Sequence, residues 1–309
     1  MNEPVPNPEP PAAGAEPRED LSAETALPLP PDRRTVTLVL RQAPARQGVA
    51  WVRRGFGAFM TRPLALAGLF AIFLFTALMA LLLPLVGGVL VLMSLPLVSL
   101  AFMLATQAIE HDRTPLPGVF VAPMTTDAAR RLAMIKLGLG YAVASFALVT
   151  VTDWLDGGTF EALQQALASD RPESREQVDA LLADPRLQTG MIARLLLAAA
   201  LAVPFWHAPA LVHWGGQGVA QALFSSTLAC WRNKAAFLAY AAAWVVVVGL
   251  FLLMVNAIAL LLSAPLALTA VMMPAVLMFS TAFYASLYFT FADCFGVRAG
   301  SRPAARIVD

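Results

Sequence analysis

Charge is scarce in this sequence. Only 13% of its 309 residues are Asp, Glu, Lys or Arg, whereas an average soluble domain has about 25%. Hydrophobic residues make up 59% of the chain, and the mean hydropathy is +0.69. One water-soluble core cannot hide that much apolar surface, so lipid must cover the excess. The composition therefore argues against an ordinary soluble domain and predicts a membrane protein.

Cysteine is also rare, since the chain has only Cys230 and Cys294. Two cysteines do not build the disulfide framework of a small secreted domain. Without a cluster of further ligands they do not make a zinc site either. We interpret both as packing residues, and we expect neither a metal nor a cofactor.

Motifs that carry chemistry are missing. The sequence has no Gly-rich phosphate loop, no GxSxG elbow and no HExxH motif. It also has no basic patch with interleaved aromatic residues that would suit nucleic acid. No charged residue lies at the middle of a predicted span, although such residues usually mark proton relays and ion pathways. We therefore expect no catalytic residue, no enzyme activity and no nucleic-acid partner.

What the chain does have is six long apolar runs. A helix needs roughly 20 apolar residues to cross a bilayer. Pro63 stands at the start of the first run, and Pro96 lies inside the second, where it predicts a kink. We predict an all-α membrane protein with transmembrane helices at about residues 64–83, 89–109, 132–152, 191–212, 235–262 and 266–291.

The remaining segments are predicted separately. Residues 1–32 are rich in Pro and Glu and should be a disordered tail, which leaves 33–309 as the membrane domain. Residues 34–42 alternate apolar and polar side chains, as a short strand or an extended arm would. The hydrophilic insertion 153–190 holds two short helical patterns and predicts a small helical hairpin.

Two amphipathic stretches are expected to lie at the membrane surface, at residues 48–62 and 218–234. The first predicts a surface helix with its aromatic face in the lipid and its guanidinium groups at the phosphates. The simpler alternative is an amphipathic lead-in to the first span. Further tryptophans flank the end of the fourth span. The predicted membrane-interface residues are Trp51, Arg53, Arg54, Phe56, Phe59, Trp206, Trp214 and Trp231.

Charge asymmetry predicts the orientation. One side of the six-span arrangement would carry a clear excess of Lys and Arg, and the other would carry the acidic insertion. Positive charge stays in the cytoplasm. We therefore expect a multi-pass protein of a bacterial inner membrane, with both termini in the cytoplasm and the helical hairpin in the periplasm.

Three polar residues fall at membrane depth and form a possible intramembrane polar site: Asn256, Gln107 and His207. Asn and Gln in spans usually form hydrogen bonds between helices. His207 and His213 also suggest a metal or general-base role, because imidazole titrates near neutrality and binds metals. Their spacing of six puts them on different faces of a regular helix, and the neighbouring tryptophans favour an interfacial anchor.

Two runs carry a family resemblance. PARQGVAWVRRGFGAFMTRPL, from Pro44 to Leu64, resembles the entry motif of a family of uncharacterised multi-pass inner-membrane proteins of proteobacteria. Trp51 supplies its second aromatic residue, while Val49 stands where the first is expected. The run FWHAPALVHWGGQGVAQALFSSTLACWRNKAAFL resembles the second motif of that family through Pro209, Ala210, Leu211, Val212, Ala222, Leu223, Ser226 and Asn233. The resemblance implies six helices in an inner membrane and implies no reaction.

These features leave three functional hypotheses. The first is a non-catalytic membrane protein that organises lipids or partner proteins, including further copies of itself. The second is a small-molecule or lipid transporter with a site near the kinks at Pro96 and Pro274. The third is a membrane-embedded enzyme built on His207 and His213.

Overall fold

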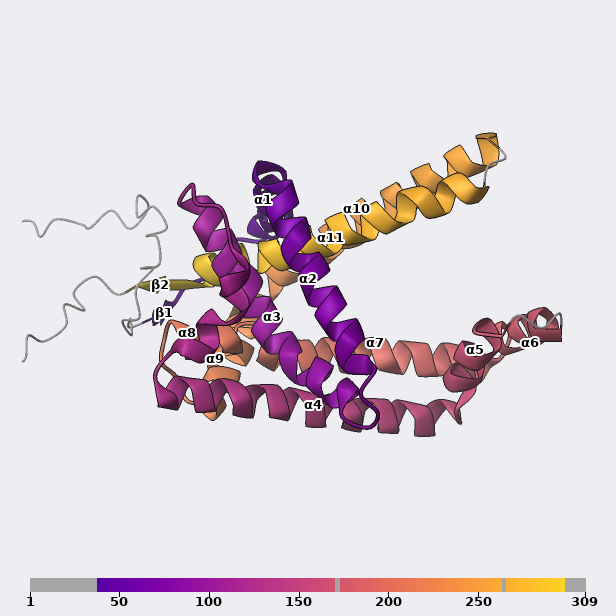
Figure 1. Ribbon diagram of the computed structural model, residues 1–309, viewed down its shortest axis with the longest axis horizontal. Helices are drawn as coiled ribbons and strands as arrows, with labels where there is room; N and C mark the ends of the chain where they lie inside the picture. Colours follow the sequence, from indigo (N-terminus) through magenta and orange to yellow (C-terminus); the bar gives the residue numbers. More distant parts are fainter. Residues whose placement is uncertain (1–37, 170–172, 263–264, 298–309) are drawn as a thin grey trace, which may run out of the picture.

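The structure is a computed structural model that describes residues 38–169, 173–262 and 265–297 (Figure 1). The predicted tail, residues 1–32, lies outside these ranges. The elements are β1 (Leu38–Leu40), α1 (Gln47–Thr61), α2 (Pro63–Leu81), α3 (Gly87–Glu110), the 3-10 helices η1 (Pro117–Phe120) and η2 (Ala122–Thr125), α4 (Ala128–Asp156), α5 (Thr159–Leu167), α6 (Glu173–Leu182), α7 (Pro185–Phe205), α8 (Ala208–His213), α9 (Val219–Arg232), α10 (Lys234–Leu262), α11 (Pro265–Cys294) and β2 (Phe295–Val297).

Among the described residues, six helical segments are long and apolar enough to cross a membrane: α2, α3, α4, α7 together with α8, α10 and α11. The predicted all-α class with six such helices is confirmed. Consecutive pairs run side by side, namely α2 with α3, α4 with α7, and α10 with α11. Figure 1 shows that the α10–α11 pair diverges from the α4–α7 pair away from the sheet.

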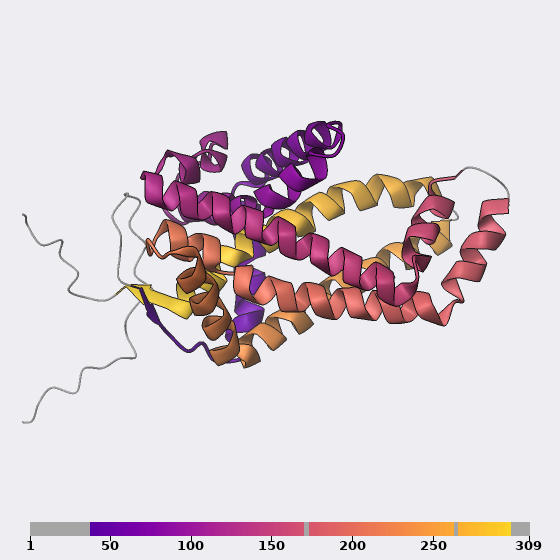
Figure 2. The same ribbon diagram turned by 90° about the horizontal axis from the view of Figure 1, so that it is seen from below.

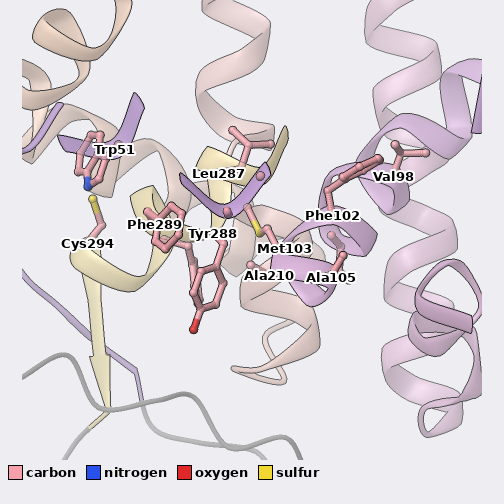
Figure 3. Packing of buried hydrophobic residues seen from close by; sticks show 14 of the residues in the cluster. Trp51, Val98, Phe102, Met103, Ala105, Ala210, Leu287, Tyr288, Phe289 and Cys294 are labelled. Carbon is pink, nitrogen blue, oxygen red and sulfur yellow. The ribbon is translucent and has the colours of Figure 1, made fainter. Parts of the chain in front are cut away.

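Helix α3 is central, because it contacts α2, α4 and α11. The core lies near the β-sheet end and takes side chains from α1, α3, α8 and α11 (Figure 3). Phe102 and Met103 of α3 are fully enclosed, as are Trp51 of α1 and Phe289 of α11. In the most apolar 18-residue stretch of each helix, 11% is buried inside the protein for α10 and 56% for α11. Helix α10 therefore leaves most of its apolar surface for lipid.

The alternating segment 34–42 contains a strand at Leu38–Leu40. This strand, β1, pairs antiparallel with β2, and Val39 lies opposite Gly296. The Arg41 amide extends the contact by donating to the Cys294 carbonyl over 2.8 Å. The segment before α1 is thereby fixed to the end of α11.

Asn233 ties the same segment to the joint between α9 and α10. It ends α9, and its side chain is buried. The Oδ1 atom accepts from the Ala43 amide at 2.7 Å, and the Nδ2 group donates to the Arg41 carbonyl at 3.1 Å. A buried amide with its partners satisfied fixes local geometry. This role explains an asparagine directly before the fifth span.

Helix α1 packs closely on α10 and α11. A Cβ atom on Gly55 would come within 2.6 Å of the Ala282 carbonyl oxygen, and one on Gly48 would overlap the Ala236 carbonyl. Gly57, on the same helix, has nothing within 4 Å of that position. Gly48 therefore lets the backbone of α1 approach α10, and Gly55 lets it approach α11. This amphipathic helix packs against both of the last two spans.

The fourth predicted span is broken in the structure. Helix α7 ends at Phe205, and α8 begins at Ala208. Pro204 and Pro209 lack the amide hydrogen that a continuous helix would use. Ser226 of α9 occupies the break, because its hydroxyl accepts from the His207 amide at 3.0 Å and donates to the Val203 carbonyl at 2.9 Å.

The hydrophilic insertion forms α5 and α6, which contact each other at the far end of α4 and α7 (Figure 2). Helix α4 ends at Gly157 and Gly158, whose φ angles of +63° and +79° lie in the left-handed region that favours glycine. This reversal directs α5 back over the ends of α4 and α7. The predicted helical hairpin is therefore present within the described residues.

Candidate functional site

A groove with a volume of about 940 Å³ lies between α7, α9, α10 and α11. We call it the lateral groove. Its wall consists mainly of alanine, aliphatic and aromatic side chains. Thr227, Ser280, Tyr240 and Tyr284 contribute hydroxyl groups, and Lys234 is the one charged residue in the lining. The lining includes Ala199, Trp206, Lys234, Phe237, Leu238, Tyr240, Ala241, Trp244, Val248 and Phe283. An apolar cavity of this size is typical of a ligand site.

Aromatic contacts hold the inner wall of the groove. The Trp206 ring centroid lies 5.6 Å from that of Phe237 and 6.0 Å from that of Phe283, both edge to face. The Trp206 Nε1 group donates to Thr290 at 3.1 Å, and the Tyr240 hydroxyl bonds Ser286 at 2.6 Å. Because their polar ends are satisfied inside the protein, these residues offer apolar ring surface to the groove.

Lys234 marks the end of the lateral groove nearest the sheet. Its Nζ atom lies 5.2 Å from the centroid of the Trp231 ring, which is 70% exposed. Cys230 also lines this end. Burial raises the pKa of its thiol to about 12. A protonated thiol is unreactive, which agrees with the packing role expected for this residue.

Two further cavities lie beside the central helices. A groove of about 660 Å³ lies between α2, α3, α4 and the η1–η2 segment, and its wall is also almost entirely apolar. A small cavity of about 180 Å³ borders Pro96 and Tyr141 and shares Trp206 and Tyr284 with the lateral groove. Pro274, the other predicted kink, is exposed on α11.

Several residues predicted for the membrane interface have close contacts within the protein. Trp51 is fully buried, and its Nε1 group donates to Asp293 Oδ2 at 2.7 Å. The same oxygen accepts from Gln47 at 2.5 Å and lies 3.4 Å from Arg54 Nη1. The Arg54 guanidinium also sits 4.0 Å above the Phe289 ring. We call this cluster the Asp293 node.

The other predicted interface residues vary in exposure. Phe59 is buried, and half-buried Phe56 packs 5.5 Å from Trp244 between ring centroids. Trp214 is also buried, with its ring stacked 5.2 Å from Phe291. Trp206 lines the lateral groove, whereas Arg53 and Trp231 are exposed.

The residues of the possible polar site lie in different surroundings. Asn256 is exposed on α10 and donates to the Leu252 carbonyl of its own helix at 2.8 Å. Gln107 is buried in α3. His207 is fully buried, with its ring 5.4 Å from Phe295 and 5.8 Å from Phe291. The side chains of Asn256 and His207 therefore do not share one cavity.

Neither histidine of the fourth span is placed with further metal ligands. In the ranges that the structure describes, no group of three or more His, Cys, Asp or Glu side chains could hold a metal ion. Neither ring nitrogen of His207 has a hydrogen-bond partner among those residues. The His213 carbonyl accepts from Arg130 Nη1 at 3.1 Å, which links α8 to α4.

Arg194, Asp153 and Asp156 form an ionic cluster where α4 and α7 meet, away from the β-sheet. Their pairing was not predicted from the sequence. Arg194 Nη1 bonds Asp156 Oδ2 at 2.6 Å, and its Nη2 group bonds Asp153. The guanidinium also lies 4.1 Å above the Phe160 ring. Asp156 is fully buried, and its Oδ1 atom accepts from the Gly158 amide at 2.9 Å. The sequence feature that could have indicated this pairing is Asp153 and Asp156, three residues apart on one helix face at the end of the third span. Arg194 lies near the start of the fourth span.

Comparison with known proteins finds a relative that matches most of the chain. A protein of Burkholderia thailandensis described as a probable inner membrane protein is 29% identical over 272 residues, which cover 85% of this chain and 96% of the relative. No protein-family model and no solved structure matches the chain. The predicted resemblance to inner-membrane proteins of proteobacteria is thereby confirmed, together with the six apolar helices. The chain is a multi-pass membrane protein related to a probable inner membrane protein of a proteobacterium.

Proposed function

We propose that this inner-membrane protein is non-catalytic and binds and organises lipids, with the lateral groove as its main contact. The observation that carries the proposal is an apolar groove of about 940 Å³ bounded by helices of membrane-spanning length. Its lining includes no Asp, Glu or His side chain that could act as a general acid or base near neutral pH.

The groove is placed where a lipid chain could enter. Helix α10 forms one wall, and its lining residue Leu238 is 71% exposed. In a bilayer, such surface lies against acyl chains. The rings of Trp206, Tyr240 and Trp244 form the inner wall and are fixed by one another, so the site is formed before a lipid arrives.

The transporter hypothesis has less support. Pro96 borders a cavity of only about 180 Å³, and Pro274 lies exposed on α11. Asn256, the polar residue of the fifth span, is satisfied within its own helix. A solute path near the two kinks would need polar groups that face a common cavity.

We also propose that the sheet end of the bundle lies in the cytoplasm. Basic side chains gather there, while the opposite end carries most of the acidic residues of the insertion. A thiol reagent that cannot cross membranes should label Gln164→Cys in α5 from outside intact cells. Both native cysteines are buried, so they add little background. Labelling only after cell lysis would place α5 in the cytoplasm and contradict the proposed orientation.

Native mass spectrometry of the protein in mild detergent tests the lipid proposal. Wild-type protein should keep phospholipid adducts, and a variant that fills the groove, Ala199→Phe with Ala241→Phe, should lose most of them. Ala200→Phe with Ala242→Phe is the matched control, because these neighbours are exposed on the same helices and do not line the groove. Equal adducts in both variants, or none in wild type, would contradict lipid binding in the groove.

A further inference from the structure

We propose that the lateral groove selects phospholipids with a net negative headgroup, which Lys234 holds at the sheet end. This inference rests on the proposed lipid-binding function and adds the chemical class of the ligand. It requires a groove as long as one leaflet, a cation at the headgroup level and no carboxylate that would neutralise that cation.

The length of the groove fits one leaflet. Along α10, its lining includes Lys234, Leu238, Ala241 and Val248, which share one face of the helix. From 234 to 248 there are 14 residue steps, or about 21 Å at 1.5 Å rise per residue. Half of a bilayer with its headgroup region is also roughly 20–22 Å thick. A phospholipid with its phosphate at Lys234 would place the ends of its chains near Val248.

The charge at this end of the groove is positive. Lys234 is exposed, and its described contact is the face of the Trp231 ring. Within the described ranges, no carboxylate lies within ion-pair distance of Lys234 or of the neighbouring Arg232. Lys234 is also the first residue of α10, where the helix dipole favours an anion.

A zwitterionic headgroup carries its own cation and gains less from this site. Phosphatidylglycerol and phosphatidylcholine with identical acyl chains therefore separate the effect of charge from that of the apolar wall. One Lys or Arg near an anionic lipid surface is worth about a fivefold change in affinity. We expect the wild-type protein to prefer phosphatidylglycerol by about that factor.

The test titrates each lipid into detergent-solubilised protein and counts adducts by native mass spectrometry. Lys234→Gln should bring phosphatidylglycerol affinity to the phosphatidylcholine level and leave phosphatidylcholine binding unchanged. Lys234→Arg should retain the preference. Arg232→Gln should retain most of it, because Arg232 does not line the groove. An unchanged melting temperature establishes that each variant is folded.

Two results would overturn the inference. Equal binding of the two lipids to wild-type protein would leave a lipid-binding groove without charge selection, and the proposed function would stand. A preference that survives Lys234→Gln would assign the selection to another place on the surface. Absence of both lipids would contradict this inference and the proposed function together.

Discussion

Replacing Arg194 with leucine should lower the free energy of unfolding by about 3–5 kcal/mol, the usual cost of leaving a buried charge without its partner. Arg194 bonds Asp153 and the fully buried Asp156, and so joins the far ends of α4 and α7. The variant would leave Asp156 facing only the Gly158 amide. Chemical unfolding in mixed micelles, followed by circular dichroism, measures the loss.

A compensating change separates charge from packing. The double variant Arg194→Met with Asp156→Leu removes the buried charge pair and leaves Asp153, whose side chain is 39% exposed to solvent. It should recover most of the stability, because apolar replacements of a buried pair are often close to neutral. Arg186→Leu is the control, since Arg186 lies in the same helix and is exposed; it should change stability by less than about 0.5 kcal/mol. An Arg194→Leu variant as stable as Arg186→Leu would contradict the role of the cluster.

Removing the acceptor of the Asp293 node should release α1. Asp293→Ala leaves the indole of Trp51 and the amide of Gln47 without their acceptor. Trp51 is fully buried, and a buried donor left unsatisfied costs about 1–3 kcal/mol, whereas water can reach the half-buried Gln47 amide. We therefore expect a loss of about 2 kcal/mol in the free energy of unfolding. Limited proteolysis should then cut within α1 faster than in wild-type protein, since this helix is held mainly against α10 and α11.

Conservative variants test the same node. Asp293→Asn keeps an acceptor oxygen, so it should lower the free energy of unfolding less than Asp293→Ala does. Trp51→Phe removes the indole N–H and also part of a fully buried ring, so it should cost about 2–3 kcal/mol. Arg53→Gln, on the exposed face of α1, should have little effect. If proteolysis of α1 is unchanged in Asp293→Ala, other contacts hold this helix in place.

The sequence predicts the helices of this protein well, because each long apolar run forms its own backbone hydrogen bonds. Pro63 begins α2, as expected for a proline in the first turn. The break between α7 and α8 is harder to predict. It depends on Ser226, which reaches the free backbone groups from a separate helix.

Side-chain surroundings were much less predictable. The amphipathic pattern of α1 shows that one face is apolar. Either lipid or a neighbouring helix can cover an apolar face, so the pattern does not tell the two apart. Trp51 therefore suits both a membrane interface and the Asp293 node. The pairing of Arg194 with Asp156 and the shape of the lateral groove depend on how the helix pairs diverge. No local pattern encodes these angles, whereas a tight contact such as Gly55 on Ala282 helps to set them.

The central claim is that a phospholipid occupies the lateral groove between α7, α9, α10 and α11. Cryo-electron microscopy of the protein in a nanodisc, with a bound antibody fragment to increase its size, tests this claim most directly. The account predicts chain-shaped density along Leu238, Ala241 and Val248, with a headgroup near Lys234. A groove closed by its own helices, or filled by a helix of another protein or a second copy, would contradict it.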